Sequence, residues 1–186
     1  MKNYALLLTV FIFSACTPAA VEPTATAVPA TATMEVATLE ISSSAFKNGE
    51  AIPSIYSCDG NNTSPALTWT EPPAGTQSFV LVMDDPDAGG TWFHWLVYNI
   101  PASSRGLSES VPTDAKFIDG TLQGRNSGGT NGYQGPCPPA EHRYFFRLYA
   151  LDTILSLPAG AHNVEVTLGI KDHILASAEL MGTYAR

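Results

Sequence analysis

Residues 80–101 read VLVMDDPDAGGTWFHWLVYNIP and contain two apolar segments on either side of a short polar loop. The apolar segments extend from Phe79 to Met83 and from Trp95 to Ile100, and both are typical of buried strands. Pro86 cannot donate a backbone hydrogen bond, so we expect the first strand to end beside it. The stretch therefore predicts two strands of a rigid sheet, with a polar loop at the sheet's end.

This loop concentrates groups that bind ligands or move protons. Asp85, Asp87 and His94 lie within ten residues of one another, and Trp92 stands beside them. Side chains of this kind at the end of a buried strand are typical of a binding or catalytic site, because the sheet holds them in place.

A second polar cluster lies about 40 residues further along the chain. It consists of the segment 135–139, which reads GPCPP, and of His142, Arg143 and Tyr144. An apolar segment, Phe145 to Leu151, follows it and predicts another strand. We expect the two polar clusters to meet in space.

Composition limits the classes of function. The chain has 186 residues and a formal net charge of −8. This length fits one domain with a tail. Nucleic-acid surfaces need a basic patch, and the chain contains no run of Lys and Arg, so we expect no nucleic-acid partner.

The first residues have the features of an export signal. Lys2 precedes an apolar segment, Tyr4 to Phe13, that is too short to span a bilayer. The following Ser14-Ala15-Cys16 resembles the lipobox of bacterial lipoproteins, in which the Cys is lipidated after cleavage. We therefore expect a signal peptide over residues 1–15, a membrane anchor at Cys16 and a location in the cell envelope outside the cytoplasm. An ordinary signal peptide is the alternative.

Residues 16–37 predict a disordered tether. They consist mainly of Thr, Ala, Pro and Val, and they contain no aromatic residue. Such a segment cannot bury enough apolar surface to offset the entropy lost on ordering. The folded domain is therefore expected to comprise residues 38–186.

Within this domain, short apolar segments alternate with turn signals. We expect strands at Leu39 to Ser43 and at Arg143 to Leu151, and residues 64–69 lead into a further strand. Asn163 to Leu168 could be a short strand or the start of a helix. Apolar residues at 174, 175, 178 and 181 have helical spacing, which predicts a C-terminal helix over 170–184. The pattern favours a mainly β fold, an antiparallel β-sandwich with one C-terminal helix.

Several motifs occur in an order that resembles one known family. They are YSCDG at 56–60, SP at 64–65, DPDA at 85–88, HW at 94–95, GY at 132–133, GPCPP at 135–139 and HRY at 142–144. Together they resemble the phosphatidylethanolamine-binding proteins, and most of all their bacterial Raf kinase inhibitor-like branch. The resemblance covers residues 38–186 and implies a two-sheet Greek-key β-sandwich with a small pocket at one end.

In that family the pocket binds phosphate or phosphorylated head groups, so we expect this protein to bind such a ligand without catalysis and without a cofactor. The resemblance implies that this pocket comprises the following residues: Asp85, Asp87, Trp92, His94, Gly135, Pro138, His142 and Tyr144. We expect the histidines to face an anionic ligand and one aspartate to orient a histidine ring. Which aspartate has this role stays open, and an amine on the ligand could instead contact either carboxylate.

Three other functions remain as alternatives. A regulatory module that inhibits a protease or another protein partner is the first. A hydrolase that uses Asp85 and Asp87 as an acid–base pair is the second, although the sequence contains no Gly-x-Ser-x-Gly motif. A metal site built from the Asp and His side chains is the third, without His-x-x-x-His or Cys-x-x-Cys spacing to support it. We therefore expect no bound metal.

Cys58 and Cys137 remain once Cys16 is assigned to the lipobox. In an oxidising compartment they could form a disulfide. Both lie in motifs shared with relatives that look cytoplasmic, so two reduced thiols beside the pocket are the other interpretation.

Overall fold

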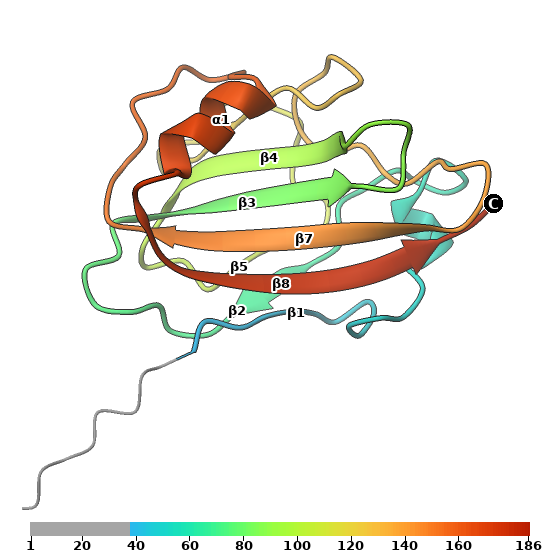
Figure 1. Ribbon diagram of the computed structural model, residues 1–186, viewed down its shortest axis with the longest axis horizontal. Helices are drawn as coiled ribbons and strands as arrows, with labels where there is room; N and C mark the ends of the chain where they lie inside the picture. The colour runs from blue at the N-terminus through green and yellow to red at the C-terminus, as the bar shows by residue number, and fades with distance from the viewer. Residues whose placement is uncertain (1–37) are drawn as a thin grey trace, which may run out of the picture. The chain divides into compact units, whose positions relative to one another are not determined.

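A computed structural model describes residues 38–186, in which eight strands form two antiparallel sheets and one α-helix is present (Figure 1). The smaller sheet has the order β1-β2-β5. Its strands are β1 (Ile41–Ser43), β2 (Leu67–Trp69) and β5 (Gly106–Leu107). The expected signal peptide (1–15) and tether (16–37) lie outside the described residues.

The larger sheet has the order β6-β4-β3-β7-β8. Its strands are β6 (Leu122–Gln123), β4 (Trp92–Pro101), β3 (Ser78–Asp85), β7 (His142–Leu151) and β8 (Ile174–Tyr184). The spatial order β7-β3-β4-β6 is that of a Greek key. Along the chain, β5 comes between β4 and β6, but it belongs to the smaller sheet. The predicted mainly β fold with two antiparallel sheets is therefore confirmed.

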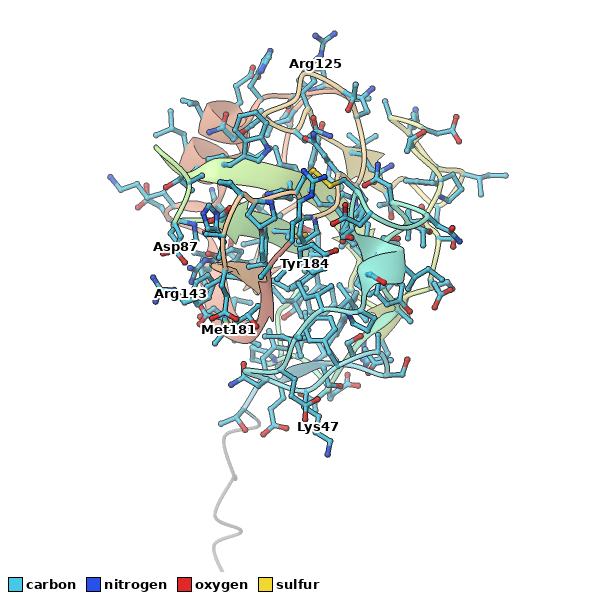
Figure 2. The ribbon with its side chains drawn as sticks, turned by 90° about the vertical axis from the view of Figure 1, so that its right-hand side faces the viewer. Lys47, Asp87, Arg125, Arg143, Met181 and Tyr184 are labelled. Carbon is cyan, nitrogen blue, oxygen red and sulfur yellow. A yellow bond between two sulfur atoms is a disulfide. The ribbon has the colours of Figure 1, made fainter. Side chains whose placement is uncertain are left out.

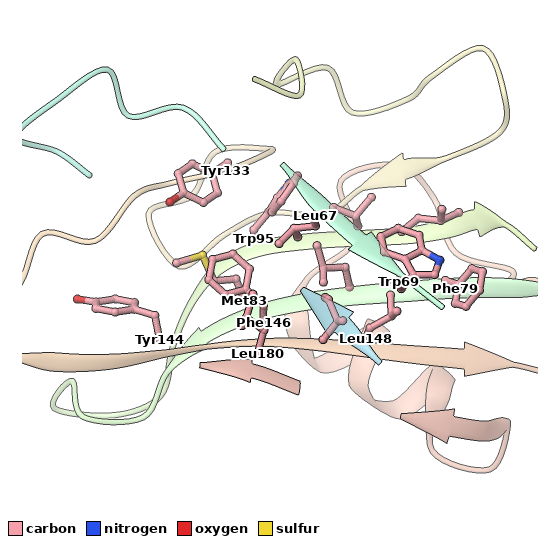
Figure 3. Close-up of a cluster of buried hydrophobic side chains, with 14 of the residues drawn as sticks. Leu67, Trp69, Phe79, Met83, Trp95, Tyr133, Tyr144, Phe146, Leu148 and Leu180 are labelled. Carbon is pink, nitrogen blue, oxygen red and sulfur yellow. The ribbon is translucent and has the colours of Figure 1, made fainter. Parts of the chain in front are cut away.

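Strand β3 lies at the centre of the larger sheet and is buried along its whole length. Phe79, Leu81 and Met83 pack in the main core, to which Leu67 and Trp69 of the smaller sheet also contribute (Figure 3). Val80 and Val82, whose side chains point to the opposite face, belong to a second apolar cluster. Burial on both faces explains why its sequence is a continuous apolar run.

The second cluster packs the helix α1 (Asn163–Ile170) on the outer face of the larger sheet. Val166 and Ile170 of the helix join Val80 and Val82 of β3 there. A 3₁₀ turn, η1 (Ser54–Tyr56), is the other helical element in the described part of the chain. No helix in residues 38–186 is both long and apolar enough to cross a membrane.

Strand β3 ends at Asp85, beside Pro86 as predicted, and the side chain of Asp85 explains this end. One carboxylate oxygen of Asp85 accepts hydrogen bonds from the backbone N–H groups of Asp87 (2.8 Å) and Ala88 (3.1 Å). This is an Asx-type turn, in which a side-chain oxygen accepts the backbone N–H groups that no longer have a partner in a neighbouring strand. The turn directs the polar loop toward the end of the sheet.

The prediction of a helix over 170–184 is wrong. The helix is α1, over the segment for which a strand or a helix start was expected, and residues 174–184 form β8. β8 pairs with β7 along its length, so that β7 supplies the backbone hydrogen bonds. Its side chains alternate, with Leu180, Gly182 and Tyr184 buried and Met181 between them only half-buried.

The outer edge of β8 is partly covered by residues 49–52. The N–H of Gly49 donates to the carbonyl of Met181 (2.8 Å), and the N–H of Ile52 donates to that of Thr183 (2.7 Å). Covering an edge strand in this way protects backbone groups that could otherwise pair with another chain.

The two-residue alternation in β8 can be tested by a pair of substitutions. Leu180→Ala should lower the free energy of unfolding by about 2–4 kcal/mol, because it leaves a cavity in the main core. Met181→Ala should cost less than about 1 kcal/mol, because this side chain points away from that core. Urea unfolding of both variants measures the difference, and similar losses at both positions would contradict the alternation.

Candidate functional site

A pocket of about 440 Å³ opens at the end of the larger sheet where β3 ends and where β4 and β7 begin. All eight residues expected to form a ligand site line it. Its lining comprises Asp85, Asp87, Ala88, Gly89, Trp92, His94, Gln134, Gly135, Cys137, Pro138, Pro139, His142 and Tyr144. The structure therefore brings the two polar clusters of the sequence together, as expected.

Asp85 connects the two clusters. Its side chain is buried, and Oδ2 accepts a hydrogen bond from Nδ1 of His142 (2.8 Å). Its other oxygen is occupied by the turn that ends β3. The question of which aspartate orients a histidine therefore has an answer in the geometry: Asp85 holds the ring of His142.

Asp87 has a different partner. Its Oδ2 accepts from Nε of Arg143 (2.9 Å) and from the Arg143 backbone N–H (3.0 Å), and its Oδ1 accepts from Nη2 (2.7 Å). Figure 2 shows the two side chains next to each other. The hydrogen bonds from Arg143 hold the pKa of Asp87 well below its usual range and raise that of Arg143. This bidentate pair ties the polar loop to the start of β7.

His94 is buried, with 5% of its surface exposed, and its Nδ1 lies 2.7 Å from the carbonyl oxygen of Gln134. A carbonyl can only accept, so Nδ1 carries a proton. Burial lowers the pKa of His94, and the Gln134 carbonyl and the charge of Asp85 only partly oppose this shift. At neutral pH the ring is therefore neutral, and its Nε2 is a hydrogen-bond acceptor.

Tyr144 forms the floor beside His94. Its ring meets the His94 ring edge-on, with the centroids 5.2 Å apart and the planes at 78°. Burial, followed by the negative charge of Asp85, raises the pKa of Tyr144. The phenol therefore keeps its proton and can donate it in a hydrogen bond.

One wall of the pocket is the segment 135–139, which lies against the residues that follow η1. The N–H of Gly135 donates to Oδ1 of Asn62 (2.7 Å). A Cβ atom at Gly135 would lie 2.3 Å from the carbonyl oxygen of Tyr56, so only glycine permits this approach. A disulfide between Cys58 and Cys137 joins the same two segments. The sequence left open whether these cysteines form a disulfide or remain reduced thiols, and the structure contains the disulfide.

The hydrolase and metal alternatives find little support in this geometry. An acid–base pair needs one carboxyl group with a raised pKa, whereas the pKa of Asp87 is lowered and Asp85 is fully engaged in hydrogen bonds. Nor do three or more His, Cys, Asp or Glu side chains gather anywhere in residues 38–186 in a way that could hold a metal ion.

The sequence did not indicate the role of Gln134. Its backbone carbonyl fixes the ring of His94, and its N–H donates to the carbonyl of His94 (3.0 Å). Backbone groups act whatever the side chain is, so no residue type could have marked this position. Gln134 is adjacent to the GPCPP motif, and this proximity was the only available signal.

The buried, neutral state of His94 predicts a dependence of stability on pH. The pKa in the folded protein is below the ordinary value of about 6.5, so the unfolded chain binds more protons once the pH falls below that value. The free energy of unfolding should therefore decrease between pH 7.5 and pH 5. His94→Gln, which keeps an N–H donor but does not titrate, should show a smaller decrease.

Urea unfolding at the two pH values measures this effect. His173→Gln is the matched control, because His173 is an exposed histidine that pairs with Asp152 outside the pocket. An unchanged pH dependence in His94→Gln would contradict the assignment.

Comparisons with known proteins agree with this architecture. The family model described as "Phosphatidylethanolamine-binding protein" matches residues 42–185. A UPF0098 protein of Methanothermobacter thermautotrophicus is 50% identical over 144 residues, which are 76% of this chain and 95% of the relative.

Two solved structures are similar to the fold. A phosphatidylethanolamine-binding protein homologue from Chlamydia trachomatis is 39% identical with a TM-score of 0.73, covering 80% of this chain and 98% of that one. YbcL of E. coli, described as a member of the mammalian PEBP family, is 34% identical with a TM-score of 0.75, covering 81% and 99%. The chain therefore belongs to the phosphatidylethanolamine-binding protein family.

Proposed function

We propose that this protein binds a small anionic ligand, such as a phosphate or a phosphorylated head group, and that it does so without catalysis. One observation carries the proposal. His94 and His142 line the same pocket, and each uses Nδ1 for a hydrogen bond to the protein, to Gln134 and Asp85 respectively. The Nε2 atom of each ring is thereby the nitrogen left for a ligand.

The carboxylate of Asp85 fits this proposal although it is negatively charged. It contacts the far side of the His142 ring and can balance the positive charge that this ring acquires when it donates from both nitrogens. The ligand then meets the imidazole and not the carboxylate. Asp87 is neutralised by Arg143 and contributes little repulsion.

The neutral state of His94 restricts the ligand further. An Nε2 acceptor favours a ligand that brings its own O–H or N–H, as a singly protonated phosphate or an amine-bearing head group does. The phenol of Tyr144 is the complementary donor. The volume of about 440 Å³ is within the usual range of small-molecule sites.

Membership in the family supports binding over catalysis, because the family is named for binding. Phosphatidylethanolamine has a head group with a phosphate and an amine, and the pocket offers both hydrogen-bond donors and acceptors to such a group. A role as an inhibitor of a protein partner has no such observation in its favour.

Calorimetric titration of residues 38–186 with phosphate and with phosphoethanolamine, at pH 6 and pH 8, tests the proposal. Both anions should give measurable binding heat to the folded domain. His142→Ala should weaken binding about tenfold, since it removes a hydrogen bond to the charged ligand.

His173→Ala is the matched control, since His173 also pairs with an aspartate but lies outside the pocket. It should leave the affinity unchanged. The absence of binding heat for both anions in the folded wild-type domain would overturn the proposal.

We further propose that the chain is a lipoprotein anchored to a membrane through Cys16, with residues 16–37 as the tether. The proposal rests on the sequence alone, namely the lipobox-like residues 14–16 and the composition of the segment that follows.

Membrane fractionation of the full chain expressed in a bacterium tests the anchor. The wild type should sediment with membranes and incorporate labelled fatty acid, because its acyl chains insert into the bilayer. Cys16→Ala should remain in the aqueous fraction without label. An equal distribution of both proteins would contradict lipidation, and Cys58→Ser controls for cysteine loss elsewhere.

A further inference from the structure

The disulfide between Cys58 and Cys137 lies at the mouth of the candidate pocket. Cys137 is one of the lining residues, and Cys58 belongs to the neighbouring segment that follows η1. Both cysteine residues are exposed, so a reductant in solution can reach the bond. Its yellow sulfur–sulfur bond is visible in the view of this end of the molecule (Figure 2).

The pocket wall around Cys137 has few other connections. Residues 136, 138 and 139 are prolines, which have no backbone N–H to donate. Within 136–141, one backbone hydrogen bond joins the wall to the rest of the protein, from the N–H of Cys58 to the carbonyl of Pro136 (3.0 Å). Pro136 and Pro138 are buried, so packing also holds this segment, and the disulfide is its covalent cross-link to the residues that follow η1.

We propose that this disulfide is a redox-sensitive cross-link that holds the pocket wall in place, and that its reduction weakens ligand binding. The inference rests on the proposed function of the same pocket. A dithiol reductant would attack one sulfur through its thiolate and form a mixed disulfide. Its second thiol then closes a cyclic disulfide, so the reductant loses two electrons and Cys58 and Cys137 end as two thiols.

The direction of the effect follows from preorganisation. In the bridged protein, Cys137, Pro138 and Pro139 are held in place before the ligand arrives. In the reduced protein the wall samples more conformations, and binding must order it again. The affinity therefore falls on reduction.

The rest of the site should survive reduction. The bridge lies outside the strands that carry Asp85, His94 and His142. Those side chains keep their own hydrogen bonds, and Gly135 stays bound to Asn62. Reduction thus changes one wall and leaves the fold in place.

The experiment compares phosphate affinity at pH 6 for the oxidised domain, the same protein with a dithiol reductant, and Cys58→Ser/Cys137→Ser. The reduced protein and the double variant should both bind about tenfold more weakly than the oxidised protein. Adding the reductant to the double variant should change nothing. Hydrogen exchange at the amide of Cys58, which donates to the carbonyl of Pro136, should accelerate on reduction, and this reports the loosened wall without any ligand.

A matched control separates loosening of the wall from a general loss of stability. Leu155→Ala removes a buried side chain from the second apolar cluster under α1 and should not alter phosphate affinity while the protein is folded. Near-ultraviolet circular dichroism checks that each protein is folded.

The outcomes distinguish this inference from the proposed function. Equal affinity of oxidised and reduced protein for phosphate would overturn the proposed redox sensitivity but would not contradict the proposed anion binding. Global unfolding on reduction would also overturn it, because the bridge would then stabilise the whole fold. No phosphate binding even by the oxidised protein would overturn both.

Discussion

The hydrogen bond between Asp85 and His142 is the contact on which the site depends. It joins the end of β3 to the start of β7, two positions that are 57 residues apart in the sequence. The same carboxylate ends β3 by accepting two backbone N–H groups, so it determines both where the strand stops and how the imidazole is oriented. The Asp87–Arg143 pair reinforces the junction from the solvent side. An apolar sheet supplies the rigid frame, and one buried carboxylate converts its end into a chemically defined pocket.

Much of the fold could be predicted because the central strands have one dominant signal. β3 and β4 are buried, so apolar runs between turn residues located them to within a few positions. The C-terminal strand was missed because Ala176, Ser177, Ala178 and Gly182 carry little hydrophobic contrast. The apolar residues at 174, 175, 178 and 181 have a spacing that also fits a helix. The pairing partner that decides the matter, β7, is not visible in a local window of sequence.

The members of the candidate site could be predicted better than their roles. Asp85 and Asp87 have the same side chain and are two residues apart, yet one is buried against an imidazole and the other pairs with an exposed guanidinium. The side-chain chemistry of the two residues does not distinguish their roles, because the difference arises from the geometry of the turn. The state of His94 likewise depends on a backbone carbonyl, that of Gln134. Motif order identified which residues gather, and only the packed structure shows which of their atoms remain available.

The long-range pairing of β3 with β7 also has a consequence for how the chain folds. Ser78 pairs with Leu151 and Asp84 with Phe145, so this ladder closes loops of more than 60 residues. Contacts so distant along the chain carry a large entropic cost before they become favourable, and proteins dominated by them fold in milliseconds to seconds. The hairpin of β3 and β4 is local and can form first, whereas β7 can pair with β3 only after the long intervening segment has been brought into place. The candidate site, which needs the end of β3 beside the start of β7, is therefore expected to be among the last parts of the domain to acquire its native form.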